Sequence, residues 1–389
     1  ESIARTADPD QALNLVGSGV ASFPHTIIGL GQLGGMLAAL RDTGCREMVI
    51  VGALERPDLR RLRFDLGALR HLPAVLSLTR GGDDSLLRRI VRFFEGQGLI
   101  VRGIGEVAPG LLAPAGRIAG PTPCPRLEAA IGRARAALAD LSRFDIGQAA
   151  VARPDGLVAV EAAEGTRRML ARLAAAGGAG ADAVLVKLPK LDQEMRIDLP
   201  AIGAGTVAEA QAAGLAAIAV AAGAAVLVER EALVRSADAA RMGVVGLRPG
   251  EPIDTTRRQT VVTAPTAGAR DMAAALALCR TVLRHARPAT ADVVAVVRDE
   301  HALVVEIDGL MRDGAAERLE RLPRGWGLPR LGRTGALAVA IGEGGLVPEA
   351  SRAIAALVPG VRRAGLAALV VELGQRDGNH LSPEVAART

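Results

Sequence analysis

Short apolar runs alternate with longer amphipathic stretches along the first two thirds of the chain. The apolar runs, which predict buried strands, lie at residues 47–51, 99–102, 183–186, 216–220 and 225–228. Stretches with apolar residues about 3.6 positions apart, which predict helices, lie at residues 34–41, 83–95, 126–141 and 167–175. Because strands that alternate with helices favour a parallel sheet, we predict an α/β protein of two linked domains with parallel or mixed sheets.

Proline-rich breaks divide the chain into segments. Residues 111–126 contain four prolines and indicate a linker, and the Arg-Pro-Gly-Glu-Pro run at 248–252 marks a second boundary. A chain of 389 residues is long enough for two or three domains, each with its own core. We therefore predict a Rossmann-like domain at 1–115, a second α/β domain at 120–248, and a C-terminal extension divided into 255–330 and 332–389.

The C-terminal extension repeats earlier material. Residues 270–319 echo residues 126–173, and the closest match sets Asp-Gly-Leu-Val-Ala-Val-Glu at 155–161 beside His-Ala-Leu-Val-Val-Glu at 301–306. Internal similarity of this kind predicts a partial duplication, so that 255–330 is a degenerate α/β repeat. A chance likeness is the alternative explanation, because any two such segments of two strands and a helix rich in Ala, Val and Leu resemble one another.

Several classes of protein are disfavoured by the composition. No stretch reaches the roughly 18 uninterrupted apolar residues of a membrane helix, and the chain does not open with the basic and apolar run of a signal peptide. We therefore expect a cytoplasmic protein. Cys45, Cys124 and Cys279 are widely separated in sequence, and the five histidines match no metal-ligand spacing, so we expect neither a disulfide framework nor a zinc site.

The net charge of +5 is spread over scattered arginines. Nucleic-acid binders combine a basic face with stacking aromatics, whereas this chain has no tyrosine and one tryptophan. We expect no nucleic-acid partner. A mildly basic chain is compatible with an anionic phosphate substrate or with an anionic membrane surface.

Lysine occurs at only two of the 47 basic positions, Lys187 and Lys190. Two clustered lysines in an arginine-rich chain indicate either a site that needs a compact ammonium group or a chance pair at a solvated strand end. They open a charged loop at 187–206 that follows a predicted strand and ends near Thr206, a predicted helix N-cap. Loops at strand ends are where α/β proteins bind ligands, although a solvated loop has the same composition.

The loop Val-Lys-Leu-Pro-Lys-Leu-Asp-Gln-Glu-Met-Arg-Ile-Asp-Leu-Pro-Ala-Ile-Gly at 186–203 resembles the signature loop of the LpxI family of UDP-2,3-diacylglucosamine pyrophosphatases. Five further stretches fit the family in the same order, namely Gly-Leu-Gly-Gln-Leu-Gly at 29–34, Gly-Ala-Leu-Glu-Arg-Pro at 52–57, Gly-Gly-Asp-Asp-Ser-Leu-Leu-Arg at 81–88, Phe-Asp-Ile-Gly-Gln at 144–148 and Val-Glu-Ala-Ala-Glu-Gly-Thr at 160–166. The resemblance covers residues 5–247.

This resemblance implies a Mg²⁺-dependent hydrolase that cleaves the diphosphate of UDP-2,3-diacylglucosamine to UMP and 2,3-diacylglucosamine 1-phosphate (lipid X) in lipid A biosynthesis. Water attacks phosphorus directly, and the reaction requires neutralised diphosphate charge and a positioned metal. The implied enzyme is cytoplasmic and peripheral to the inner membrane, where its glycolipid substrate lies, with a homodimer as one expected state. Its active site is expected between the two domains.

The resemblance also implies roles for individual residues. Asp198 takes the place of the family's essential aspartate and is predicted to bind the metal or activate water. Lys187, Lys190 and Arg196 are predicted to hold phosphate oxygens. The further predicted contacts are Gln148, Glu161, Glu164, Thr166, Thr206, Asp83 and Asp84. Helix caps or strand-end polar groups explain Gln148, Glu161, Glu164 and Thr166 equally well, and Asp83 and Asp84 also suit a helix start.

The chain departs from the family pattern at its first residues, where the family has a strand and a glycine loop. Residues 336–341, followed by Gly342, Gly344 and Gly345, resemble that missing piece, and such a loop lets backbone N–H groups approach a phosphate. Two interpretations compete. The chain is circularly permuted, with 332–380 completing the first domain and 336–341 in one sheet with 47–51, or the tail is a degenerate second copy.

A second departure is Arg167, at a position where the family pattern favours an acid. A reversed charge beside the site motivates an alternative function, a catalytically impaired relative that binds a nucleotide sugar or lipid. A generic nucleotide-sugar transferase is a third interpretation, which requires an acceptor other than water.

Overall fold

The computed structural model resolves the chain into two compact units. Unit 1 contains Glu1–Gly110, Asp192–Leu199 and Gly325–Pro329, and unit 2 contains Leu111–Leu191, Pro200–Arg324 and Arg330–Thr389. The structure describes residues 12–16, 25–29, 32–42, 44–51, 65–67, 83–144, 148–162, 164–190, 193–249, 274–275, 277–282, 285, 292–298, 301–307, 336–341 and 368–373.

Unit 1 combines two small pairs of strands with helices. Its elements are β1 (Ala12–Val16), β2 (His25–Gly29), α1 (Leu33–Asp42), β3 (Glu47–Val49), α4 (Asp83–Glu95), β4 (Ile100–Arg102) and α5 (Ile104–Val107). β1 and β2 pair antiparallel, and β3 and β4 pair parallel. Met36, Leu37 and Leu40 of α1 share a buried cluster with Val91 and Phe94 of α4, as the helical spacing of apolar residues predicts. The Rossmann-like character of this region stays a prediction.

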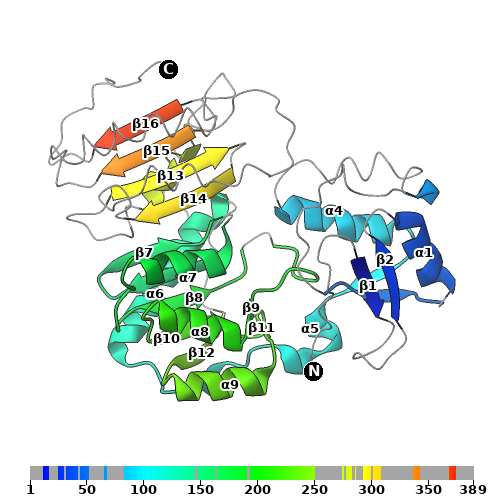
Figure 1. The fold of residues 1–389 in the computed structure, drawn as a ribbon, viewed down its shortest axis with the longest axis horizontal. Coiled ribbons are helices and arrows are strands. Elements are labelled where there is room, and N and C mark those ends of the chain that lie inside the picture. Colours follow the sequence, from blue (N-terminus) through cyan, green and yellow to red (C-terminus); the bar gives the residue numbers. More distant parts are fainter. Residues whose placement is uncertain are drawn as a thin grey trace. The chain divides into compact units, whose positions relative to one another are not determined.

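Unit 2 is built on a six-stranded mixed sheet of order β5-β12-β10-β8-β6-β7 (Figure 1). Its strands are β5 (Gly116–Ala119), β6 (Ala149–Arg153), β7 (Gly156–Val160), β8 (Val184–Lys187), β10 (Ala217–Ala221) and β12 (Gly243–Leu247). A short parallel pair, β9 (Ala201–Ile202) and β11 (Val226–Leu227), accompanies it. The helices are α6 (Pro125–Leu141), α7 (Gly165–Ala175), α8 (Ala204–Ala212) and α9 (Arg230–Ala239), with 3₁₀ turns at Pro109–Leu111 and Ser142–Phe144.

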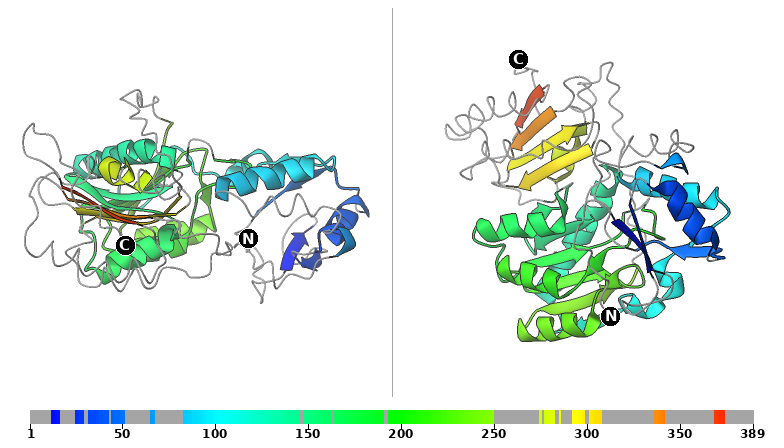
Figure 2. Two further views of the ribbon diagram at one scale, coloured as in Figure 1. Left: turned by 90° about the horizontal axis from the view of Figure 1, so that it is seen from above. Right: turned by 45° about the vertical axis from the view of Figure 1, so that its right-hand side comes forward.

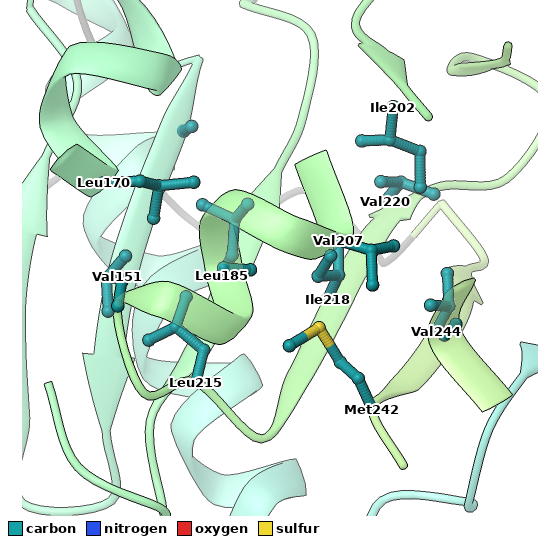
Figure 3. Packing of buried hydrophobic residues seen from close by; sticks show 14 of the residues in the cluster. Val151, Leu170, Leu185, Ile202, Val207, Leu215, Ile218, Val220, Met242 and Val244 are labelled. Carbon is teal, nitrogen blue, oxygen red and sulfur yellow. The ribbon is translucent and has the colours of Figure 1, made fainter. Parts of the chain in front are cut away.

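The central strands of this sheet are buried on both faces. Within β8, Val184 and Val186 pack into the apolar cluster that contains α6, whereas Leu185 packs into the cluster formed with α7, α8 and α9. Successive strand residues point to opposite faces, so strands covered by helices on both sides read as continuous apolar runs. Figure 3 shows Leu185, Leu170 and Ile218 in the second cluster. The apolar runs at 183–186 and 216–220 are therefore central strands of this sheet, β8 and β10.

The linker prediction for 111–126 is wrong in part, because this segment contains β5, which pairs antiparallel with β12. A Cβ atom at Gly246 of β12 would overlap the carbonyl oxygen of Pro114. Glycine at 246 thus lets the proline-rich segment lie directly against the strand, and the prolines end β5 without excluding it from the edge of the sheet.

A second, four-stranded sheet of unit 2 has the order β14-β13-β15-β16. Its strands are β13 (Asp292–Arg298), β14 (His301–Ile307), β15 (Ala336–Ile341) and β16 (Ala368–Leu373). The prediction that β15 shares a sheet with β3 is wrong, because β15 pairs with β13 and β16 and β3 pairs with β4. This topology contradicts the permuted arrangement. It also joins strands from the predicted segments 255–330 and 332–389 in one sheet.

The two sheets of unit 2 share an apolar layer. Ala275, Leu278, Cys279 and Val282, from helical residues between 274 and 285, lie in one buried cluster with residues of α6. Figure 2 shows these two helical segments on the same side of the strands. Cys279 is fully buried in this cluster, and its thiol lies 3.8 Å from the Val293 carbonyl oxygen. None of the helices in the described ranges combines the length and apolar character that a membrane crossing requires.

Candidate functional site

Two strands of unit 2 end in polar residues at the same edge of the six-stranded sheet. β7 and β8 both pair antiparallel with β6, so they run in the same direction and their carboxyl ends meet at one edge. Lys187 is the last residue of β8, and Glu161 directly follows β7. Ligands of α/β sheets bind outside the carboxyl ends of the strands. This edge is the candidate site of unit 2.

A chain of hydrogen bonds joins Lys187, Thr166 and Glu161 at this edge. The Lys187 Nζ atom donates to Thr166 Oγ1 at 3.0 Å, and the Thr166 hydroxyl donates to Glu161 Oε2 at 2.9 Å. All three residues are half-buried. Thr166 lies in the first turn of α7, where backbone N–H groups have no partner within the helix. The arrangement places one ammonium group beside a helix N-terminus, and both features favour an anion.

Glu164 and Gln148 also lie near this edge, in different roles. Glu164, the N-cap residue of α7, accepts a short hydrogen bond from Arg172 in the last turn of that helix, and both side chains are largely buried. Gln148 accepts a hydrogen bond from the Leu188 amide through its backbone carbonyl at 2.9 Å. Both were predicted to line the same site as Lys187, and the structure shows an ion pair between Glu164 and Arg172 and a backbone hydrogen bond of Gln148 that extends the β6–β8 ladder.

Asp198 lies in the loop Asp192–Leu199, which belongs to unit 1. The amide nitrogen Nε2 of Gln193 donates to Asp198 Oδ2 at 2.6 Å and to the Asp198 carbonyl at 2.8 Å. Gln193 is 7% exposed, so its two hydrogen bonds are made in a desolvated environment. One buried amide thereby fixes both the backbone and the carboxylate of Asp198. Gln193 was not singled out from the sequence, although it stands inside the signature loop.

Arg196 attaches this loop to helix α4. Its guanidinium pairs side by side with Glu194, Nε to Oε1 at 2.8 Å and Nη2 to Oε2 at 2.9 Å, and its Nη1 atom reaches Glu95 Oε1 at 2.7 Å. The hydrogen bonds from Arg196 lower the pKa of Glu194, and the same bonds raise the pKa of Arg196. Ile197 packs against the apolar cluster of unit 1. Arg196 thus positions the loop; its predicted contact with phosphate stays a prediction.

The acidic side chains of this loop determine how a magnesium ion could bind to it. Among the residues that the structure describes, no three His, Cys, Asp or Glu side chains gather as a metal-binding group. Mg²⁺ keeps several water ligands and commonly binds one or two carboxylates together with phosphates, so it needs no all-protein cage. The single oriented carboxylate of Asp198 fits an ion held mainly by phosphate oxygens.

The remaining residues predicted for the site belong to α8, to α4, to the signature loop and to the glycine loop after β15. α8 begins at Ala204 with Gly203 as its N-cap, so the prediction that Thr206 is the N-cap is wrong; Thr206 Oγ1 instead accepts from the Gly203 amide at 3.3 Å. α4 begins at Asp83, which agrees with the predicted helix start. The ligand roles of Asp83, Asp84 and Lys190 stay predictions. Gly342, Gly344 and Gly345 lie outside the described residues.

Arg167, the residue of reversed charge, lies on an exposed part of α7. Its side chain is 86% exposed, and its Nε atom pairs with Glu209 Oε1 of α8 at 3.0 Å. An exposed charge that is screened by solvent and paired with a carboxylate perturbs a neighbouring site weakly.

Comparisons with known proteins match both halves of this arrangement. The LpxI N-terminal domain matches residues 14–111, and the LpxI C-terminal domain matches residues 114–245. A curated relative, UDP-2,3-diacylglucosamine pyrophosphatase LpxI from Caulobacter vibrioides, is 39% identical over 235 residues, which span 59% of this chain and 84% of the relative. The chain belongs to the LpxI family. In this LpxI family member the loop Asp192–Leu199 lies within the range of the C-terminal domain but is part of unit 1.

Proposed function

We propose that this LpxI family member hydrolyses the diphosphate bond of UDP-2,3-diacylglucosamine and releases UMP and 2,3-diacylglucosamine 1-phosphate (lipid X) in lipid A biosynthesis. The observation that carries the proposal is the 39% identity to a pyrophosphatase of this name over 84% of that protein's length. The hydrogen-bonded group at the carboxyl ends of β7 and β8 supports it with a chemistry suited to phosphate.

Lys187 is the residue proposed to contact the diphosphate in unit 2. An ammonium group attracts phosphate oxygens and neutralises charge that builds up when a phosphorus–oxygen bond breaks. The hydrogen bond to Thr166 at 3.0 Å orients this ammonium group, and Glu161 in turn orients the Thr166 hydroxyl. Since side chains that are held in place before the reaction lose little freedom on binding, this support favours catalysis.

Asp198 is proposed to hold a Mg²⁺ ion and to act on the attacking water. When bound, the ion would supply Lewis-acid polarisation of the phosphoryl group and neutralise its charge. The protein's own contribution is the orientation of the carboxylate by Gln193, which donates to Oδ2 at 2.6 Å. Arg196, bound to Glu194 and Glu95, keeps the loop on unit 1.

The deciding experiment measures UMP release from UDP-2,3-diacylglucosamine with Mg²⁺, with EDTA, and in the Asp198→Ala variant. We expect release by the intact chain and loss in the variant and in EDTA. Asp155→Ala is the matched control, because Asp155 lies in the exposed turn between β6 and β7, at the opposite end of these strands. Substrate binding without UMP release would support instead a catalytically impaired protein.

Peripheral association with a membrane is a second part of the proposal. The substrate carries two acyl chains and therefore resides in a bilayer, and the chain has a formal net charge of +5, which favours anionic lipid surfaces. Flotation with anionic vesicles at low and high salt tests this association. Binding that is lost at high salt agrees with an electrostatic contribution, and no binding at low salt contradicts it.

A further inference from the structure

The four-stranded sheet of unit 2 repeats the topology of four strands in the six-stranded sheet. In the first set, β7 pairs antiparallel with β6, β6 pairs antiparallel with β8, and β8 pairs parallel with β10. In the second set, β14 pairs antiparallel with β13, β13 pairs antiparallel with β15, and β15 pairs parallel with β16. The order and direction of all four strands agree.

The irregularities of the two sheets agree as well. The β6–β7 hairpin has a register shift between Val151 and Ala152, and the β13–β14 hairpin has one between Val296 and Val297. One constant offset in residue number relates these two positions. The same offset relates Glu161 to Glu306 and Asp140 to His285. A bulge is a specific backbone feature, so its recurrence at the equivalent position supports descent from a duplicated segment.

The first copy contains α6 and the strands β6, β7, β8 and β10, and the second copy contains the helical residues between 274 and 285 and the strands β13 to β16. The two copies contact each other through equivalent elements. β14 lies against β7, which is its counterpart in the first copy (Figure 1). His285 Nε2 lies 2.9 Å from Oδ2 of its counterpart Asp140. Contacts between equivalent residues are the mark of a two-fold, isologous interface. The apolar layer beneath this pair is also shared, because Leu278 and Val282 of the second copy pack with α6.

The second copy does not keep the lysine of the site. Lys187 faces Ala149 across the β8–β6 ladder, and Val339 faces Val294, the counterpart of Ala149, across the β15–β13 ladder. Val339 thus stands at the position of Lys187. Glu306 keeps the position of Glu161, but the ammonium group that the first copy holds beside its helix N-terminus is replaced by an apolar side chain.

We propose that the described strands and helical residues between 274 and 373 are an internal partner for the first copy. The full chain is then a monomer in which the first copy alone carries the Lys187 site. The internal copy covers the β7 edge and the adjoining part of α6, the surface through which two identical units would pair. An Asp140 on each side of a true two-fold axis would oppose two carboxylates. In this chain the counterpart is histidine, which favours pairing within the chain over pairing between two chains.

The first test is the mass of the full chain by light scattering coupled to size exclusion over a wide concentration range. We expect the monomer mass of 40.0 kDa at all concentrations. A stable dimer would overturn the proposal, since the pairing surface would then be open to a second chain.

The second test changes and then exchanges the two side chains of the interface pair. His285→Asp opposes two carboxylates at the contact and is expected to lower Tm by about 2–4 °C, and the double exchange D140H/H285D is expected to restore it. An unchanged Tm in the single variant, or no recovery in the double variant, would show that the copies do not pair through these residues. Neither measurement uses UMP release, so its outcome is independent of the proposed pyrophosphatase function.

Discussion

The ammonium group of Lys187, at the end of β8, donates a hydrogen bond to the hydroxyl of Thr166 in the first turn of α7. The two residues are far apart in sequence, and the antiparallel pairing of β6 with both β7 and β8 brings them to one edge. This contact converts a cation at a strand end into an oriented group. Variants of this contact, and of the Gln193 amide that orients Asp198 in unit 1, measure what the orientation contributes.

Thr166→Val removes the hydroxyl but keeps the branched shape of the side chain. We expect kcat/KM for UMP release to fall about 10- to 100-fold, because the ammonium group loses its orienting partner. Thr166→Ser keeps the hydroxyl and is expected to retain most of the activity. Equal loss in both variants would indicate that shape, rather than the hydrogen bond to Lys187, is what the site requires.

Glu161→Gln tests the second hydrogen bond in the series Lys187–Thr166–Glu161, and it has a matched control in the second copy. The substitution weakens the acceptor of the Thr166 hydroxyl, and we expect a drop in kcat with little change in Tm. Glu306→Gln changes the equivalent position of the second copy, where Val339 replaces the lysine, and should leave kcat unchanged. A similar drop in kcat in both variants contradicts the proposal that the first copy alone carries the active site.

Gln193→Met removes the amide that donates to Asp198. Because the carboxylate then loses its fixed orientation, we expect a higher Mg²⁺ concentration for half-maximal activity and about a 10- to 100-fold loss in kcat/KM. Titration of UMP release with Mg²⁺ measures both effects. A variant with the wild-type Mg²⁺ dependence would separate Asp198 from metal binding.

The Arg196–Glu194 pair predicts a specific dependence of stability on pH. Its hydrogen bonds lower the pKa of Glu194 from the ordinary value of 4.5, so the folded state binds that proton more weakly than the unfolded state. The stabilisation is therefore fully present above about pH 4.5 and is lost as the pH falls through the lowered pKa.

Thermal unfolding between pH 3 and pH 7, taken as roughly the range over which carboxylates titrate, measures this dependence. Arg196→Met should lower Tm near neutral pH and flatten the decrease at acid pH. Arg235→Met removes an exposed pair with Glu231 and serves as the control, for which we expect little change. Parallel pH profiles for wild type and Arg196→Met would contradict the assigned stabilisation.

Leu185→Ala tests the two-sided burial of the central sheet. Leu185 is fully buried among residues of α7 and α8 (Figure 3), and we expect a loss of about 2–5 kcal/mol in the free energy of unfolding. Leu111→Ala is the matched control, because Leu111 is 43% exposed. Urea denaturation measures both, and equal losses would contradict the layered arrangement.

Local patterns predicted several of the helices and strands between residues 33 and 247. The helix predicted at 83–95 is Asp83–Glu95, and that predicted at 126–141 is Pro125–Leu141. The strand predicted at 183–186 is Val184–Lys187. These elements follow from apolar spacing within a few residues. β5 was missed because a short edge strand with one covered face carries little periodicity, and its flanking prolines indicate a loop.

The α/β class, the family resemblance and the residue types of the candidate site follow from the sequence alone, because they depend on local spacing and on the order of motifs. Which of those residues touch depends on the folded chain, which joins Lys187 to Thr166, Asp198 to Gln193, and Arg196 to Glu95. Strand pairing also contradicts the permuted arrangement, since β15 lies beside β13 and not beside β3. An apolar strand can pair with many partners, and the choice is made by registers and packing between segments that are remote in sequence.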